Sequence, residues 1–339
     1  MRRRDLPTEF HSTAPLRLDF AGAWTDVPPF SAREGGVVVN AAIGLKCHVA
    51  LTLGGKLLRL VSEDLGETLE VANSGGLVKG GKLDLLKAAL RMFPVLGGFT
   101  LTTRCDAPPG SGLGSSGALD VALVAALTQA RLDRFSERDL AEHAWQVEAV
   151  EAKIPGGKQD QYAAALGGWH RLSFRDPDVG VEPLTLDPAF AGALERQIVL
   201  CYTNTSRVSG DTIARVMRAY EGGDRKVTGA LHGLKDVADA MAEALREADL
   251  ARVGTLLAEN WTHQQALDPG MRTPEMVRLE QAMRSAGGGA LGGKAAGAGA
   301  GGSMFFLVAG DRRAAVDAAT AAGATVLPVT WAAEGVRAW

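Results

Sequence analysis

The feature that most constrains this chain is a run of glycine and serine between an expected strand and an expected helix. Residues 108–116 read Pro-Pro-Gly-Ser-Gly-Leu-Gly-Ser-Ser. Residues 99–105 have the pattern of a strand, and residues 118–127 are strong helix formers. Backbone N–H groups reach an oligophosphate only where side chains do not obstruct them, and a helix N-terminus favours anions. The order predicts a phosphate-binding loop, with a turn that merely packs the helix on a sheet as the alternative.

The residues of this loop exclude two common nucleotide-binding motifs. A Walker loop needs a lysine before its serine or threonine, and none is present here. The dinucleotide fingerprint needs an acidic residue at the end of the following strand, which is missing at the expected distance. One of the two final serine hydroxyls can cap the helix and the other can reach a phosphate oxygen or a magnesium ion. The residues expected to hold a nucleotide are Pro109, Gly110, Ser111, Gly112, Leu113, Gly114, Ser115 and Ser116.

The length and element pattern predict two domains. A chain of 339 residues is long for one hydrophobic core. Residues 14–20 and 36–53 have strand patterns, whereas helices are expected between residues 211 and 286, before a second glycine-rich loop over 287–302. Residues 175–180 form a turn-rich candidate junction. We therefore expect an α+β protein with domains over 1–186 and 187–339.

Charge and cysteine content narrow the classes of partner. The formal net charge is -3 and the pI is near 6.1, which gives no general reason to bind nucleic acid or an anionic membrane. No stretch is apolar enough to span a bilayer. The three cysteines lie far apart in the sequence without a CxxC pair, so neither a disulfide framework nor a zinc site is expected. We expect a cytoplasmic protein that binds small molecules, and a homo-oligomer is compatible with the sequence.

Two acidic residues precede or begin an expected helix that ends at Leu166. Asp160 follows a glycine turn, where a carboxylate can take a proton from an attacking hydroxyl or orient it. A simple cap of the helix is the alternative. Glu148 lies on the preceding helix, expected over 136–153, where it can hold magnesium together with Ser116 or belong to a solvated helix face.

A third group of polar residues lies near the N-terminus, where a strand leads into a turn. Arg17 can stabilise charge on a transferring phosphoryl group, and Asp26 can accept hydrogen bonds from sugar hydroxyls. A surface ion pair for Arg17 and a turn cap for Asp26 are the alternatives.

In order and spacing, these segments resemble the GHMP superfamily of kinases across nearly the whole chain. Three motifs carry the resemblance: residues 14–26, residues 108–116 and the glycine-rich residues 292–302. The resemblance implies an N-terminal domain like ribosomal protein S5 domain 2, a ferredoxin-like C-terminal domain, and ATP with Mg²⁺ in the cleft between them. It also implies that Asp160 is the catalytic base and Arg17 its transition-state partner, and that Ser116 and Glu148 are the magnesium ligands.

Within the superfamily, residues 156–168 and 35–43 look most like the D-glycero-D-manno-heptose 7-phosphate kinases. This branch implies phosphorylation at O1 to the 1,7-bisphosphate, for synthesis of a nucleotide-activated heptose. Ala23 and Gln264 depart from its pattern, because glycine and lysine are usual there. Lys158, Arg207 and Arg33 are candidate cations for the substrate's own phosphate, with solvated surface charges as the alternative, and Lys158 can instead keep Asp160 ionised. The expected substrate-binding residues are Asp26, Thr25, Gly157, Lys158, Gly299 and Arg207.

Three other functions compete with a heptose kinase. The turn at residues 24–29 also resembles fucokinases, which makes a fucokinase-like or other hexose 1-kinase the main alternative. A non-catalytic sugar sensor of the same fold would be free to lose Asp160, Arg17 and Glu148, yet all three are present. A decarboxylase of this fold would need a different loop around the acid.

Overall fold

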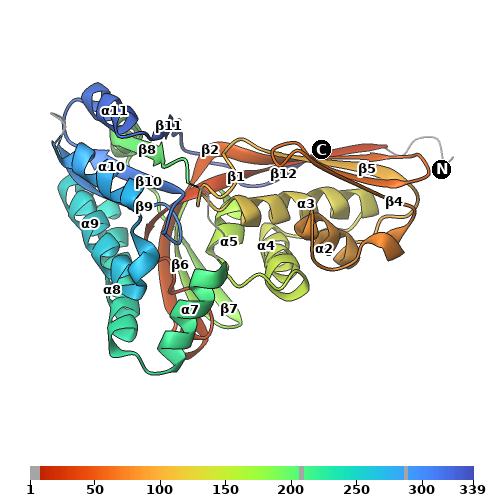
Figure 1. Cartoon of the computed structure of the whole chain (residues 1–339), viewed down its shortest axis with the longest axis horizontal. Coiled ribbons are helices and arrows are strands. Elements are labelled where there is room, and N and C mark those ends of the chain that lie inside the picture. Colours follow the sequence, from red (N-terminus) through yellow and green to blue (C-terminus); the bar gives the residue numbers. More distant parts are fainter. Residues whose placement is uncertain (1–7, 206–209, 286–288) are drawn as a thin grey trace.

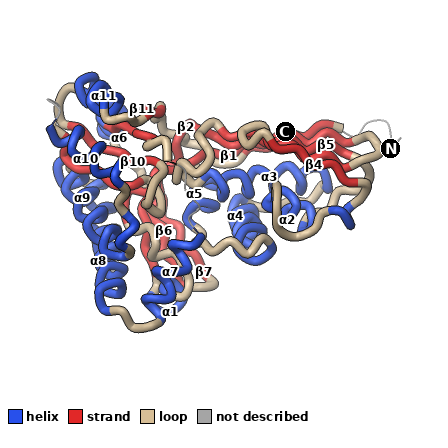
Figure 2. Tube along the Cα trace, in the orientation of Figure 1, coloured by secondary structure: helices blue, strands red, loops and turns tan. Residues whose placement is uncertain are grey.

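The computed structural model describes residues 8–205, 210–285 and 289–339. The molecule has two arms, which meet near its centre (Figure 1). The long arm contains most of a large sheet with helices on one of its faces, and the other arm contains the remaining strands and the later helices (Figure 2). The described strands form a sheet of 8 and a sheet of 4, which confirms the α+β class.

The first sheet is built around the long hairpin of β1 (Glu9–Ala21) and β2 (Gly36–Leu53). The range predicted from the β-branched run of β2 is confirmed. One half of β2 pairs with β5 (Phe99–Cys105) and the other half pairs with β6 (Trp169–Arg175), so one strand runs through both arms. β3 (Leu58–Ser62) and β4 (Glu67–Val71) extend the sheet beyond β5, and β7 (Asp178–Pro183) extends it beyond β6.

Helices cover one face of the long arm, as Figures 1 and 2 show. α3 (Ser115–Arg131) packs against β1 and β2, and its apolar residues, such as Leu123 and Val124, are fully buried. The predicted helix over 136–153 is one α-helix followed by a π-helical turn, η2 (Gln146–Glu151), and it carries Glu148. The helices of this layer are α2 (Asp84–Met92), α3 (Ser115–Arg131), α4 (Glu137–Trp145) and α5 (Gln159–Leu166).

The second sheet has the order β11-β8-β10-β9 and belongs to the other arm. All its neighbouring pairs are antiparallel. Its strands are β8 (Ile198–Tyr202), β9 (Ala290–Ala295), β10 (Ser303–Val308) and β11 (Thr325–Leu327). The same arm contains the helices α6 (Pro188–Gln197), α7 (Gly210–Glu221), α8 (Arg225–Arg246), α9 (Leu250–Leu267), α10 (Pro274–Ser285) and α11 (Arg312–Ala321).

Two features of the fold bear on the expected domain organisation. Residues 175–180, expected to be a turn-rich junction, contain the end of β6, a turn at residues 176–177 and the start of β7, and both strands belong to the first sheet. The last strand, β12 (Arg337–Ala338), pairs with β1, so the end of the chain returns to the first sheet. The boundary at residue 186 stays a prediction.

Candidate active site

A cavity of about 300 Å³ lies where the three glycine-containing motifs meet. Its wall includes Arg17 from β1, the loop glycines Gly110, Gly112 and Gly114, and Asp160 from the first turn of α5. Gly297 and Ala298 close it from the second glycine-rich loop. Segments far apart in the sequence therefore form one wall, as the resemblance implied.

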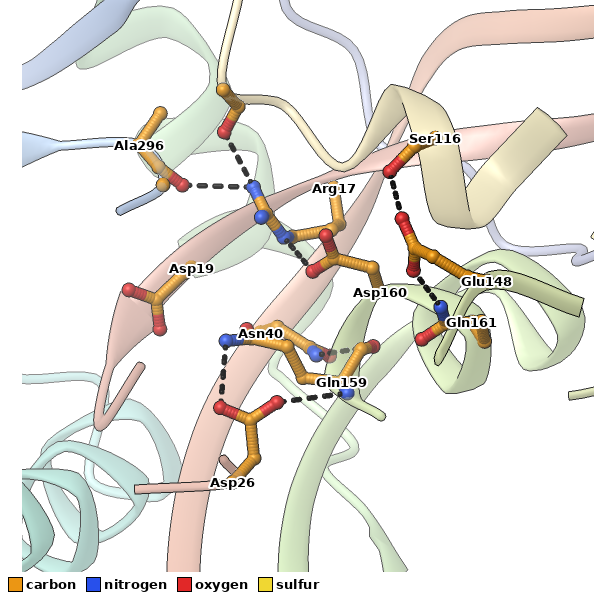
Figure 3. A network of polar contacts seen from close by, with 12 residues as sticks. Arg17, Asp19, Asp26, Asn40, Ser116, Glu148, Gln159, Asp160, Gln161 and Ala296 are labelled. Carbon is orange, nitrogen blue, oxygen red and sulfur yellow. Dashed lines mark hydrogen bonds and ion pairs between the residues drawn. The ribbon is translucent and has the colours of Figure 1, made fainter. Parts of the chain in front are cut away.

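Arg17 connects the three motifs (Figure 3). Its Nε donates to Asp160 Oδ1 at 2.8 Å, and its Nη1 donates to the carbonyls of Gly112 and Ala296, both also at 2.8 Å. Arg17 is 5% exposed, so these bonds hold the guanidinium in one position at the cavity wall. The surface ion pair considered for Arg17 is excluded by this burial.

Asp160 lies beside the loop of residues 108–116 because glycines let the start of α3 approach it. A Cβ placed on Gly117 would lie 2.7 Å from the Asp160 Cβ, and one on Gly114 would lie 3.2 Å from the Asp160 carboxyl carbon. The Asp160 side chain is 26% exposed and lines the cavity. Its carboxylate is bonded to Arg17, and α5 begins without a side-chain cap. A substrate hydroxyl in the cavity can therefore reach this carboxylate.

Ser116 and Glu148 form the second polar group of the wall. Ser116 Oγ donates to Glu148 Oε1 at 2.5 Å, and Gln161 Nε2 donates to Glu148 Oε2 at 2.6 Å (Figure 3). Burial raises the pKa of Glu148 to about 7, and the nearby charge of Asp160 acts in the same direction. Glu148 lies in the π-helical turn η2 and is only 8% exposed, so it does not belong to a solvated helix face.

Asp26 faces the same cavity from the turn after β1. Its Oδ2 accepts the backbone N–H of Gln159 at 3.1 Å, directly before Asp160. Burial raises the pKa of Asp26 to about 7, although the bond from Gln159 opposes the shift. A Cβ on Gly157 would lie 1.9 Å from Asp26 Oδ2, which explains the glycine at this position.

Trp24 is a cavity residue that the sequence analysis did not select. It lines the wall, is 3% exposed, and its Nε1 has no hydrogen-bond partner within the described structure. Its φ of 83° is unusual for a bulky residue, and such strain is concentrated at functional sites. Thr25 fixes this turn, because its single Oγ1–H lies between the Gly22 and Val37 carbonyl oxygens and its Oγ1 accepts from Val37 N. The signal in the sequence that could have selected Trp24 is its position two residues before Asp26, the expected sugar-binding aspartate.

Several predicted residues lie away from the cavity wall. Lys158 is turned away from Asp160: its Nζ donates to Glu142 at 2.8 Å and to the Pro177 carbonyl at 3.2 Å. Thr25 is fully buried, and Gly299 lies against Met271, since a Cβ there would be 2.6 Å from its sulfur. Arg33 pairs with Glu221 on the surface, and Arg207 lies outside the described residues. Of the loop, Pro109, Ser111 and Leu113 are not in the cavity wall.

The second glycine-rich loop braces the first from the other arm. Ser303 N donates to Ser111 O at 2.7 Å, and a Cβ on Gly297 would lie 2.4 Å from the Gly112 carbonyl oxygen. Gln264, where the heptose branch commonly has lysine, is fully buried and donates to Gly297 O at 2.7 Å. The side chain at position 264 therefore supports the loop from within the arm.

Comparisons with known proteins agree with this geometry. The models of the GHMP kinases N terminal domain and of the GHMP kinases C terminal match residues 77–168 and 241–325. The chain is 32% identical to D-glycero-alpha-D-manno-heptose 7-phosphate kinase of Campylobacter jejuni, over 96% of this chain and 97% of that protein. It is 26% identical to the bifunctional fucokinase/GDP-fucose pyrophosphorylase of Arabidopsis thaliana, over 75% of this chain and 26% of the plant enzyme.

A solved structure shows the same similarity. The crystal structure of a D-glycero-D-manno-heptose 1-phosphate kinase from Bacteroides thetaiotaomicron superposes with a TM-score of 0.77 at 26% identity, covering 97% of this chain and 98% of that one. The two-domain fold and the convergence of the three motifs on one cavity define an ATP-dependent kinase. The chain belongs to the GHMP kinase family and, within it, is a sugar kinase with heptose-phosphate kinases among its relatives.

No described helix is long and apolar enough to cross a membrane.

Proposed function

We propose that this chain transfers the γ-phosphoryl group of ATP to the anomeric O1 hydroxyl of D-glycero-D-manno-heptose 7-phosphate. The observation that carries the proposal is Arg17, which bonds to Asp160, to the phosphate loop and to the second glycine-rich loop at one cavity. The similarity over nearly full length to a heptose 7-phosphate kinase supports the choice of sugar. Cytoplasmic location and any homo-oligomer remain predictions from the sequence.

Asp160 serves as the base in this proposal. Its carboxylate accepts the proton of the attacking O1 hydroxyl, while the bond from Arg17 holds that carboxylate in place. The Arg17 guanidinium also offers positive charge toward the transferring phosphoryl group, whose equatorial oxygens carry the negative charge of the transition state. The glycines of residues 110–114 present backbone N–H groups at the N-terminus of α3, which suits the phosphates of ATP.

Ser116 and Glu148 have the donor atoms that suit Mg²⁺. Both offer oxygen, and Mg²⁺ is commonly held by one or two protein oxygens together with water and substrate phosphates. No cluster of three or more histidine, cysteine, aspartate or glutamate side chains suited to a metal occurs in the part of the chain that the structure describes. When bound, the ion would neutralise charge on the phosphates. Ser116→Ala should raise the magnesium concentration that half-activates the enzyme, and an unchanged titration would exclude Ser116 as a ligand.

The sugar end of the cavity offers hydrogen-bond acceptors and an aromatic side chain. Asp26 can accept hydrogen bonds from sugar hydroxyls, and Trp24 forms part of the wall. Among the described wall residues Arg17 is the sole cation. Its bonds to Asp160 and to two carbonyls hold it at the end of the cavity where phosphoryl transfer is proposed, and not at the end proposed for the sugar. Arg207, which precedes α7 in the sequence, remains the candidate for the 7-phosphate, since Ile213 of α7 lines the cavity.

A panel of acceptors tests the proposal. ADP release should be measured with heptose 7-phosphate, free heptose, fucose, galactose and mannose, using Asp160→Asn as the inactive control. We expect the highest kcat/KM with heptose 7-phosphate. A clear preference for fucose would instead favour the fucokinase-like alternative, which the 26% identity to a plant fucokinase makes the second candidate.

A further inference from the structure

Cys47 and Cys105 are far apart in the sequence but lie opposite each other in the first sheet. Cys47 on β2 is the direct partner of Cys105 on β5. The neighbouring pair carries a backbone hydrogen bond from Asp106 N to Lys46 O at 2.9 Å, so the cysteines occupy a pair without backbone hydrogen bonds. Such pairs place their Cα atoms about 4.5 Å apart. A disulfide spans roughly 4.4–6.8 Å between Cα atoms, so this position permits one.

The two thiols differ in a way that assigns their roles. Both are free, and Cys47 is 1% exposed whereas Cys105 is partly exposed. The interaction with Cys47 lowers the pKa of Cys105, and the Ala107 N–H acts in the same direction, whereas burial opposes the shift. Cys105 is therefore the more exposed thiol of the pair and the one with the lowered pKa, and Cys47 is the buried thiol beside it.

We propose that Cys47 and Cys105 form a modification site, at which a hydroperoxide converts the two thiols into an intrachain disulfide. The Cys105 thiolate attacks the peroxide, the O–O bond breaks, and Cys105 becomes a sulfenic acid while an alkoxide or hydroxide leaves. The Cys47 sulfur then attacks the sulfenic sulfur. The S–S bond forms, the S–O bond breaks, and the hydroxyl leaves as water with the Cys47 proton. A dithiol reductant reverses the change.

This site touches the phosphate loop. Cys47 Sγ donates to the Ser115 carbonyl at 3.4 Å, and Ser115 is the first residue of α3 and part of the cavity wall. The disulfide removes the Cys47 proton, so the Ser115 carbonyl loses this donor. On the assumption that this loop binds ATP, as proposed above, oxidation should weaken ATP binding by roughly threefold, the order of one modest hydrogen bond.

Thiol counting on the full-length protein tests the modification without using activity. The chain has three cysteines, and Cys201 is buried in the second sheet, so Cys201→Ser is the matched control. After treatment with hydrogen peroxide, denaturation in iodoacetamide should alkylate two fewer thiols in the parent and in Cys201→Ser. A peptide joining residues 47 and 105 should appear in a non-reducing digest and disappear with dithiothreitol. Cys105→Ala, at the more exposed position, should yield no such linked peptide. Cys47→Ala should also yield none.

Three outcomes would overturn the proposal. They are full alkylation after peroxide, oxidation of Cys105 to the sulfinic acid without a linked peptide, and a bridge between two chains on a non-reducing gel. ATP binding is then compared by calorimetry between the oxidised and reduced protein, and equal affinity would refute the link to the phosphate loop. A reduced protein that binds no ATP would refute the proposed kinase function and leave the disulfide mapping valid.

Discussion

Two ion pairs begin two residues apart on the same face of β1 and have opposite environments. Arg17 pairs with Asp160 at 2.8 Å, and the Asp160 side chain is 26% exposed at the cavity. Asp19 pairs with Lys294 of β9, and both side chains are 0% exposed. Lys294 Nζ also donates to the Asp19 carbonyl at 2.7 Å, so this second pair joins the first sheet to the second.

The difference teaches that access decides what a charge pair can do. Arg17 and Asp160 line the cavity, so a substrate can contact this pair and the pair can take part in chemistry. The Asp19–Lys294 pair is fully buried. Each charge is stabilised by the other, because water cannot reach the pair to replace either partner. Burial lowers the pKa of Lys294, which shows the desolvation cost, while Asp19 opposes the shift.

The largest expected effect is on stability at the fully buried pair. Lys294→Met leaves the Asp19 carboxylate buried without its partner, and we expect the free energy of unfolding to fall by about 3–5 kcal/mol. Urea denaturation checks this, with Lys82→Met as the control. Lys82 makes a 2.6 Å pair with Glu67 but is 72% exposed, so its loss should cost less than about 1 kcal/mol. An equal fall in the free energy of unfolding of the two variants would contradict the view that burial makes the Asp19–Lys294 pair more important for stability.

The next effect is on catalysis at the accessible pair. Asp160→Asn should keep the fold and ATP binding but lower kcat by about 100-fold or more, because the base is lost. Steady-state kinetics and calorimetry measure the two quantities. Asp224→Asn, at the N-cap of α8 where asparagine also caps, should keep the parent kcat. Near-normal turnover in Asp160→Asn would contradict its assignment as the base.

Glu148 lies between the two extremes, buried but beside the cavity. Because its pKa is raised from 4.5 to about 7, the folded state binds this proton more tightly than the unfolded state does. The contribution of Glu148 to stability is therefore full below about pH 4.5 and is lost as the pH rises to about 7. Glu148→Gln lacks this loss, so relative to the parent it should gain about 2 kcal/mol between those pH values.

Urea denaturation of Glu148→Gln and the parent at both pH values gives this difference directly. Gln161 Oε1 has no partner within the described structure, so the Gln161 amide can turn to accept the new donor. Glu70→Gln, whose side chain is 50% exposed, should show little change between the two pH values. A pH-independent difference for Glu148→Gln would show that folding does not raise the pKa of Glu148.

The smallest effect concerns Trp24, which faces the cavity without a charge. Trp24→Phe keeps a ring but makes the side chain in the cavity wall smaller, so we expect the KM for the sugar to rise by about fivefold while the KM for ATP stays unchanged. Trp331→Phe is the control, because its Nε1 donates to Ala191 O at 2.9 Å and lies outside the cavity wall. An unchanged sugar KM in Trp24→Phe would remove Trp24 from the substrate site.

The sequence alone determined the fold class and much of the local structure. The β-branched run of β2 and the pattern of β5 predicted both ranges correctly, because side-chain alternation and turn residues act over a few positions. The glycines of residues 110–114 predicted a loop before a helix, and the structure has α3 there. The three motifs indicated the family, and the comparisons confirmed it.

Only the tertiary structure decided which polar side chains face the cavity. Lys158 lies two residues before Asp160, yet its ammonium bonds to Glu142 and to the Pro177 carbonyl, because a start of a helix directs successive side chains in different directions. Trp24 lies in the cavity wall because it belongs to a strained turn that Thr25 holds. Local propensity does not predict such a turn. Cys47 and Cys105 became neighbours through strand register, a long-range property that depends on how whole strands pair.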